Sequence, residues 1–283
     1  MIFVSTSCIK NKLIKSSIED LAINGFKNIE LSGGTELYDD FEDDLFNLKE
    51  KYSLNYRCHN YFPPPKKHFV LNLASLDNAS FNNSFEHLKR VISLSKKLDS
   101  YKFGFHAGFY IDIRVNEIGK KISRNKLFDK EKSLQRFCEA FTKLKKIEPE
   151  VTLFIENNVF SSTNAATYEG KNPFMMTSFL EYKALKEKID FSLLLDVAHL
   201  KVSSNSLGLD WENELTKMVV ESNYIHISDN DGFHDLNNML TKKSNFLSIL
   251  SEHDNSNKDF TLEVYDGMES IKKSYDILSE VVS

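Results

Sequence analysis

Short apolar runs alternate with segments of helical period along the whole chain, and this alternation constrains the fold more than any other feature. In the helical segments apolar residues recur at spacings of three and four, as they do from Phe85 to Leu98. Regular alternation of this kind is typical of parallel β-α units. Several apolar runs are almost unbroken, which suits strands buried on both faces. We predict strands at Ile2–Ser5, Lys27–Leu31, Leu54–His59, Tyr101–His106, Val151–Glu156, Phe191–Asp196, Tyr224–Ser228 and Phe260–Val264.

Eight strands, each followed by a helix, predict an α/β fold in which residues 1–283 form a single (β/α)8 TIM barrel domain. A second helical pattern runs from Leu134 to Leu144, and Ser270 to Leu278 supplies the closing helix. A length of 283 residues also fits two domains, but no internal repeat or Pro-, Gly- or Ser-rich linker divides the chain. A doubly wound open sheet is the alternative fold. It usually carries a Gly-rich phosphate-binding turn after its first strand, and this chain lacks one.

Composition excludes several classes of protein. Hydrophobic residues make up 41% of the chain and charged residues 27%, the balance of a globular protein. No apolar run approaches the roughly 20 residues of a membrane span. The net charge of −5 disfavours nucleic-acid binding, which needs clustered Lys and Arg. The first residues read as a buried strand rather than a secretion signal, and Cys8, Cys58 and Cys138 form no metal or disulfide pattern, so we expect a cytoplasmic protein with reduced thiols.

Polar side chains end several of the predicted strands, and in a barrel these ends build the active site. Glu156, Asp196, His226 and Glu263 end the last four strands. Burying a carboxylate without a partner is costly, so three acids and a histidine that converge at one point predict a shared cation. Such ligands suit one divalent ion, Mn²⁺, Mg²⁺, Co²⁺ or Zn²⁺. Taken singly, Asp196 could cap a helix, Glu263 could pair with a lysine and His226 could be a core histidine.

The chain resembles the xylose-isomerase-like TIM-barrel superfamily, which includes sugar and sugar-phosphate isomerases and epimerases and the endonuclease IV type of DNA-repair enzyme. The resemblance covers nearly the whole chain. It is carried by Cys-His59-Asn-Tyr-Phe-Pro-Pro-Pro, Asn72-Leu-Ala-Ser-Leu-Asp77, Phe-His106-Ala-Gly, Ile-Glu156-Asn-Asn, Leu-Asp196-Val-Ala-His199, His226-Ile-Ser-Asp-Asn-Asp-Gly and Leu-Glu263-Val-Tyr.

The resemblance to the ketose 3-epimerase branch implies that Glu156, Asp196, His226 and Glu263 hold one divalent metal, and that Glu156 and Glu263 double as acid and base. It implies a metal-dependent isomerase or epimerase of carbohydrate metabolism that moves a proton through a metal-stabilised enediolate. His199 is then a substrate contact. Relatives of this kind often assemble as homodimers or homotetramers, and a small sugar is the expected partner.

Further candidate substrate contacts are less specific. His59 and His106 end the third and fourth strands, where the endonuclease branch places ligands for a second metal; here they could instead bond a sugar. Asp229 and His234 lie in the segment after the seventh strand. Arg114 belongs to a basic interruption from Ala107 to about Lys132, which is either a lid that accepts a phosphate or an ordinary solvated loop.

Three alternative functions remain open at the level of sequence. An endonuclease IV-like phosphodiesterase is favoured by the early histidines and the Asn72 segment, but the Asp-x-His pair which that branch carries after the seventh strand is absent. A dehydratase of a keto-sugar or polyol would use the same enediolate to expel a hydroxyl. A binding protein without catalysis is disfavoured because both glutamates and both other metal-ligand positions are present.

Overall fold

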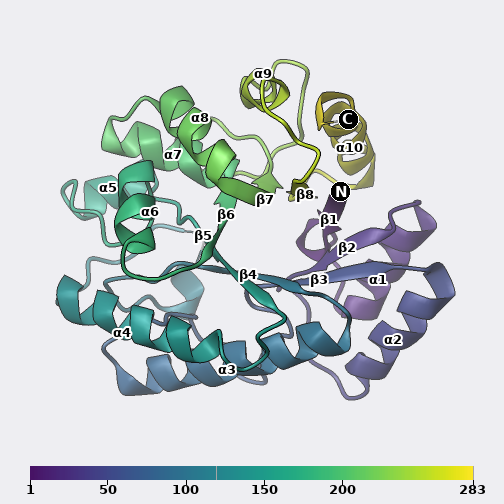
Figure 1. Cartoon of the computed structure of the whole chain (residues 1–283), viewed down its shortest axis with the longest axis horizontal. Helices are drawn as coiled ribbons and strands as arrows, with labels where there is room; N and C mark the ends of the chain where they lie inside the picture. Colours follow the sequence, from purple (N-terminus) through teal and green to yellow (C-terminus); the bar gives the residue numbers. More distant parts are fainter. Residues whose placement is uncertain (119, 283) are drawn as a thin grey trace.

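The computed structural model describes residues 1–118 and 120–282. Eight parallel strands follow one another in chain order, and β8 pairs with β1 to close the barrel. Figure 1 shows the N-terminus beside β8 and the last helix, α10, on the same side of the barrel. The strands are β1 Ile2–Ser5, β2 Asn28–Leu31, β3 Asn55–His59, β4 Lys102–His106, β5 Thr152–Glu156, β6 Ser192–Asp196, β7 Ser222–Ile227 and β8 Asp259–Leu262.

The predicted (β/α)8 barrel is confirmed, and all eight expected strands are present. Strands β2 to β6 each begin one residue later than the sequence pattern indicates, whereas β7 begins two residues earlier and β8 one residue earlier. Strand β8 ends at Leu262, two residues before its predicted end. Glu263 therefore stands one residue beyond the strand, with its N–H donating to the Ile227 carbonyl oxygen at 3.0 Å.

Helices surround the barrel on its outside, and Figure 1 shows them as a ring around the strands. Their apolar faces pack on the sheet while charged residues face outward, as expected for amphipathic helices. Two helices, rather than one, follow both β5 and β6. The helices are α1 Ile14–Ile23, α2 Phe41–Tyr52, α3 Asn78–Lys97, α4 Lys130–Leu144, α5 Ser162–Thr167, α6 Phe179–Lys186, α7 Val197–Leu207, α8 Trp211–Glu221, α9 Phe246–Ser251 and α10 Met268–Val282, with short 3₁₀ turns η1 Thr6–Cys8 and η2 Val115–Glu117. None of these helices is long and apolar enough to cross a membrane.

Large side chains fill the interior of the barrel. Phe154, Leu194 and Tyr224 form a separate buried cluster inside it. The Arg57 guanidinium lies between the rings of Phe3 and Tyr224, 4.1 and 4.2 Å from their centroids. This filling makes the barrel a packed core rather than a pore.

The long connection between β4 and α4 packs on the rest of the molecule. Ile111 and Ile122 lie in a small buried cluster with Phe160, Tyr168 and Phe174, which come from the β5–β6 connection. A basic residue of the connection, Arg124, pairs with Glu169. The predicted interruption is thus a loop, with η2 as its regular element and α4 beginning at Lys130.

Candidate metal and substrate site

The carboxyl ends of β5 to β8 bring four candidate ligands together. Asp196, His226 and Glu263 each offer one ligand atom within 4.8 Å of the others, and Glu156 forms a like group with Asp196 and His199. His226 joins the two sets: its Nδ1 is 3.6 Å from an oxygen of Glu156 and 3.5 Å from an oxygen of Glu263. The parallel register of the strands produces this convergence, since Asp196 pairs directly with His226.

Asp196 has two roles in the structure. It is the N-cap of α7, with one carboxylate oxygen accepting the His199 backbone N–H at 2.7 Å. The Asn157 side chain brackets the Asp196 backbone, accepting from its N–H at 2.7 Å and donating to its carbonyl at 2.9 Å. The helix-capping alternative for Asp196 is therefore correct, and it coexists with the cluster because the carboxylate also belongs to the groups with cation-site geometry.

The donor atoms at this position suit a divalent metal. Within the described residues, Glu156 Oε2 and His226 Nδ1 are buried and no neighbour meets them with hydrogen-bond geometry, although histidine nitrogens lie 3.2 and 3.3 Å from the first and carboxylate oxygens 3.5 and 3.6 Å from the second. Buried polar atoms are almost always paired, so two unpaired ones in the same cluster call for a ligand. Three carboxylates and one imidazole form an oxygen-rich set that Mn²⁺, Mg²⁺, Co²⁺ or Zn²⁺ accepts.

The acids of the cluster differ in their proton affinity. Burial raises the pKa of Glu156 well above its usual range, even though the charges of His226 and His199 oppose the change. Burial also raises the pKa of Asp196, to about 6, with attraction by His199 opposing and repulsion by Asp235 adding to it. For Glu263 burial is outweighed by His226, and its pKa is lowered. Two glutamates beside the same histidine thus have opposite pKa shifts in the metal-free site.

The candidate substrate histidines His59 and His106 lie against Glu156. His59 Nε2 and His106 Nδ1 are 3.3 and 3.2 Å from the same oxygen, Oε2. Burial lowers the pKa of both imidazoles. The three residues form a further group with the geometry of a cation site. They can therefore bond a substrate or hold a second ion.

Glu30, near the end of β2, is a buried carboxylate that sequence reasoning missed. It is fully buried, and one of its oxygens lies 3.1 Å from His226 Nε2. Burial would raise its pKa, but the charges of His226 and His59 lower it. The same signal that indicated Glu156, an acid within an apolar strand, is present in Asn28-Ile-Glu-Leu31. This strand carries a single such residue, whereas the later strands end in several polar residues each and so stand out more clearly in the sequence.

His199 enters the site from the first turn of α7. Its Nδ1 is 2.9 Å from the Asn157 carbonyl oxygen, and its Nε2 is 3.3 Å from a carboxylate oxygen of Asp235. Burial would lower the pKa of His199, but Asp196 and Asp235 outweigh burial and raise it. Asp235 is a second site residue that sequence reasoning missed. The sequence instead indicates its neighbour, His234, as the candidate contact.

The structure does not bring Asp229 or His234 to the cluster. The Asp229 carboxylate accepts from Ser244 Oγ at 2.5 Å and pairs with Lys201 Nζ at 3.1 Å. His234 is 55% exposed and its ring bonds Asp231 at 2.8 Å. Asp231 also accepts the backbone N–H groups of Phe233 and His234, and this turn directs His234 to solvent.

Arg114 is the remaining candidate substrate contact, and it lies in the β4–α4 loop. Its side chain is exposed, and its backbone N–H donates to Glu117 at 3.2 Å.

Asn72 and Asn158 hold the start of this loop over the barrel: Asn72 accepts from Phe109 N–H at 3.0 Å, and Asn158 donates to the Ala107 carbonyl at 3.0 Å. The Asn72 segment therefore shapes the mouth of the barrel through the loop backbone.

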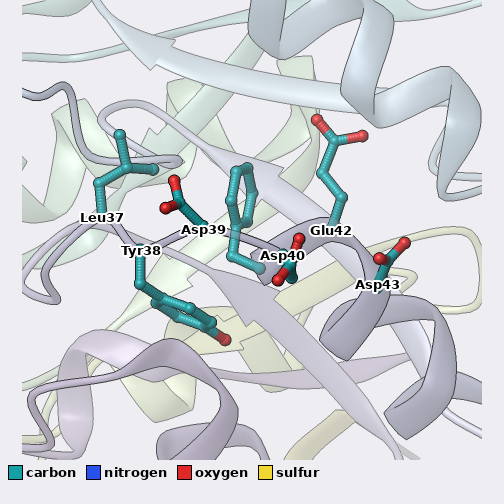
Figure 2. Close-up of a pocket in the computed structure, with 7 residues that line it drawn as sticks. Leu37, Tyr38, Asp39, Asp40, Glu42 and Asp43 are labelled. Atoms are coloured by element: carbon teal, nitrogen blue, oxygen red, sulfur yellow. The ribbon is translucent and has the colours of Figure 1, made fainter.

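A shallow acidic pocket lies beside the start of α2, apart from the cluster. Its lining runs from Leu37 to Asp43. Figure 2 shows Asp39, Asp40, Glu42 and Asp43 pointing in different directions rather than to a common centre. Among the described residues, the groups with cation-site geometry all lie at the barrel mouth or in the barrel interior beneath it, and none includes these acids.

The fold and this cluster define a TIM barrel with a candidate metal centre at its carboxyl-terminal mouth. The chain belongs to the xylose isomerase-like TIM barrel family, whose model matches residues 18–280. A search by sequence among curated proteins finds no match.

Solved structures with the same fold include sugar epimerases and a nuclease. A D-tagatose 3-epimerase-like protein has a TM-score of 0.74 at 17% identity over 99% of this chain and 96% of its own. A D-psicose 3-epimerase from Clostridium cellulolyticum has a TM-score of 0.69 at 13% identity over 100% and 99% of the two chains. Endonuclease IV from Thermus thermophilus has a TM-score of 0.63 at 14% identity over 99% and 97%. Identities this low establish the shared fold alone.

Proposed function

We propose that this protein is a divalent-metal-dependent isomerase or epimerase of a sugar or sugar derivative. The observation that carries the proposal is the placement of two glutamates, Glu156 and Glu263, with carboxylate oxygens 3.6 and 3.5 Å from His226 Nδ1. Asp196 completes the set of ligands. The similarity to sugar 3-epimerase structures supports the same class of substrate.

A divalent cation held by these four residues would polarise a carbonyl and the adjacent hydroxyl and stabilise the enediolate formed when the neighbouring carbon loses its proton. The remaining steps fall to protein groups. In our proposal Glu263, whose pKa is lowered, accepts the carbon-bound proton, and Glu156, whose pKa is raised, delivers one from the other side. Return of the proton to the opposite face inverts the centre, and return to the neighbouring carbon moves the carbonyl.

The other polar groups at the mouth would orient the sugar. His199 Nδ1 is bonded to the Asn157 carbonyl, so Nε2, which faces Asp235 at 3.3 Å, is the nitrogen that would contact a substrate oxygen, shared with or in place of Asp235. His59 and His106 would contact hydroxyls on the β3 and β4 side. Arg114, whose side chain is exposed, stays a proposed contact for a phosphate or other anionic substituent.

The test combines metal analysis with isotope exchange. Purified wild-type protein is analysed for bound metal and incubated in deuterium oxide with a panel of ketoses and sugar phosphates. We expect about one ion per chain and deuterium at one carbon-bound position, lost in Glu156→Gln and in Glu263→Gln. Glu214→Gln is the matched control and should retain exchange, because Glu214 is a buried glutamate on α8 that accepts the Phe179 N–H at 2.6 Å and belongs to none of the groups with cation-site geometry. Absence of any bound metal would refute the proposal.

One observation favours a second candidate, an endonuclease IV-like phosphodiesterase. His59, His106 and Glu156 form a further cation-site group beside the first, and clustered ions are the means by which such enzymes activate water. Several zinc ions per chain, no deuterium exchange and cleavage of an abasic-site oligonucleotide would establish this activity instead. If exchange occurs but a hydroxyl is lost from the product, the enzyme is a dehydratase.

A further inference from the structure

The Glu30 carboxylate lies in the barrel interior beside His226, and its polar contacts are with residues of the barrel strands. One oxygen, Oε2, accepts a hydrogen bond from the Tyr224 hydroxyl and another from Thr261 Oγ1 at 2.9 Å. His226 Nε2 lies 3.1 Å from the other oxygen, Oε1, and makes its hydrogen bond with Oε2 at 3.3 Å. Since an ionised carboxylate can only accept hydrogen bonds, its closest histidine nitrogen must be the donor.

This contact determines which nitrogen of His226 is free. In the neutral ring, the form that can bind a metal, the proton on Nε2 is directed at Glu30, and Nδ1 then keeps its lone pair and faces Glu156 and Glu263. Nδ1 has no hydrogen-bond partner among the described residues. A ring with the opposite tautomer would direct an N–H at the cluster and a lone pair at the Glu30 carboxylate, and the second of these contacts is repulsive.

Tyr224 and Thr261 hold Glu30 in this position from two further strands. Because both donate to Oε2, the carboxylate cannot rotate away from His226 without losing two buried hydrogen bonds. Glu30 has no exposed surface, and it comes from β2, which lies outside the run of strands β5 to β8 that supplies the four candidate ligands. A carboxylate this deeply buried is costly unless its partners stabilise the charge, and His226 is the partner that connects it to the cluster.

We propose that Glu30 is a positioning residue that orients His226 and sets its tautomer, so that Nδ1 is available to a divalent metal. The inference rests on the proposed metal function of His226. Carboxylates that accept from the second nitrogen of a ligand histidine increase the basicity of the ligand and fix its ring, and their loss typically costs about ten- to a hundredfold in metal affinity.

The experiment compares Glu30→Met, which removes the acceptor, and Glu30→Gln, which keeps the shape, with Glu214→Gln as control. The first readout is the affinity of each metal-free protein for Mn²⁺, by calorimetric titration. We expect a loss of about tenfold for Gln and more for Met, and no change for the control. The second readout is the tautomer of His226 by nitrogen NMR of histidine-labelled protein, with the signal assigned by His226→Gln. We expect the Nε2–H form in the wild type and a mixture in Glu30→Met.

Unchanged Mn²⁺ affinity in both folded Glu30 variants would overturn the proposal, and so would the Nδ1–H tautomer in the wild type. Two ions in the wild type and one in the Glu30 variants would also overturn it, because Glu30 would then be a ligand with His59 rather than a positioning residue. If Glu30→Met fails to fold, Glu30→Gln decides. A wild type that binds no Mn²⁺ refutes the metal function, and the tautomer comparison still tests the contact between Glu30 and His226.

Discussion

Asp235 and His199 form an ion pair at the rim of the barrel, with 3.3 Å between a carboxylate oxygen and Nε2. Sequence reasoning had favoured the neighbouring residue, His234. The pair joins the loop after β7 to the first turn of α7, and it holds the His199 ring near Glu156, whose Oε1 is 3.6 Å from Nδ1. Asp235 thereby connects a surface loop to the centre of the site.

The first prediction concerns this pair. Hydrogen bonds to charged groups contribute about 1.5–3 kcal/mol, so Asp235→Asn should lower kcat/KM for the substrate found by deuterium exchange by about ten- to a hundredfold. His234→Gln should have a small effect because the ring of His234 faces solvent. Steady-state kinetics on the two variants checks this. A larger loss in His234→Gln than in Asp235→Asn would support the sequence-based assignment instead.

The second prediction concerns metal removal. Without a cation, Glu156, Asp196 and Glu263 repel one another in a buried cluster, and an ion at about a hundred times its dissociation constant adds about 2.7 kcal/mol to stability. A shift of about 2–4 °C per kcal/mol is typical for a chain near this size. We therefore expect EDTA to lower Tm by about 5–10 °C, with recovery on adding Mn²⁺. In Asp196→Asn the difference in Tm between the EDTA-treated and the Mn²⁺-loaded protein should be smaller. A difference equal to that of the wild type would place the stabilising ion elsewhere.

The third prediction concerns the ion pair at the opposite end of the barrel. Asp259 contacts Arg57 at 2.6 Å and Lys102 at 2.7 Å, while Arg57 lies between two aromatic rings. Asp259→Asn leaves the Arg57 charge buried without a carboxylate and should cost about 3–5 kcal/mol. Arg57→Met should cost less because Asp259 keeps Lys102. Urea unfolding measures both, and the reverse order would show that the stacked rings, not the charge pair, hold Arg57.

The fourth prediction concerns pH and His87. Burial lowers the pKa of His87 to about 4, and the nearby charge of Arg90 adds to the effect. The ring packs against Tyr61 and Phe69, outside the cluster. In the unfolded chain His87 has a pKa of about 6.5. Between the folded-state and the unfolded-state pKa the unfolded state binds more protons, so stability falls as pH falls.

From pH 6.5 to 4 this group should cost about 3 kcal/mol, since one pKa unit corresponds to about 1.4 kcal/mol. At pH values well above the unfolded-state pKa, protonation of His87 should have no effect on the stability of the protein. The His87→Gln variant keeps a polar side chain without the proton, so its stability profile should be flatter than that of the wild type over this range. Chemical unfolding at several pH values gives both profiles. Parallel profiles would mean that His87 binds its proton as readily in the folded state as in the unfolded state.

Much of the candidate site follows from the sequence because strand ends have a fixed meaning in a parallel barrel. Short apolar runs mark the strands, and the residue after each run must lie at the mouth, whatever the loops do. Glu156, Asp196, His226 and Glu263 could therefore be chosen without coordinates. Their roles as ligands and acid or base remain proposals.

The parts that only the tertiary structure decided depend on contacts between distant segments. That Glu30 lies against His226 follows from closure of the barrel, which brings β2 and β7 to face each other across its interior, and no local pattern encodes that distance. Asp235, rather than His234, contacts His199 because of a turn that Asp231 stabilises. In this turn the side chain of His234 points to solvent and that of the next residue, Asp235, points to the site. Strand periodicity is a local property of the chain, whereas the orientation of a side chain on a loop is set by the hydrogen bonds of its folded surroundings.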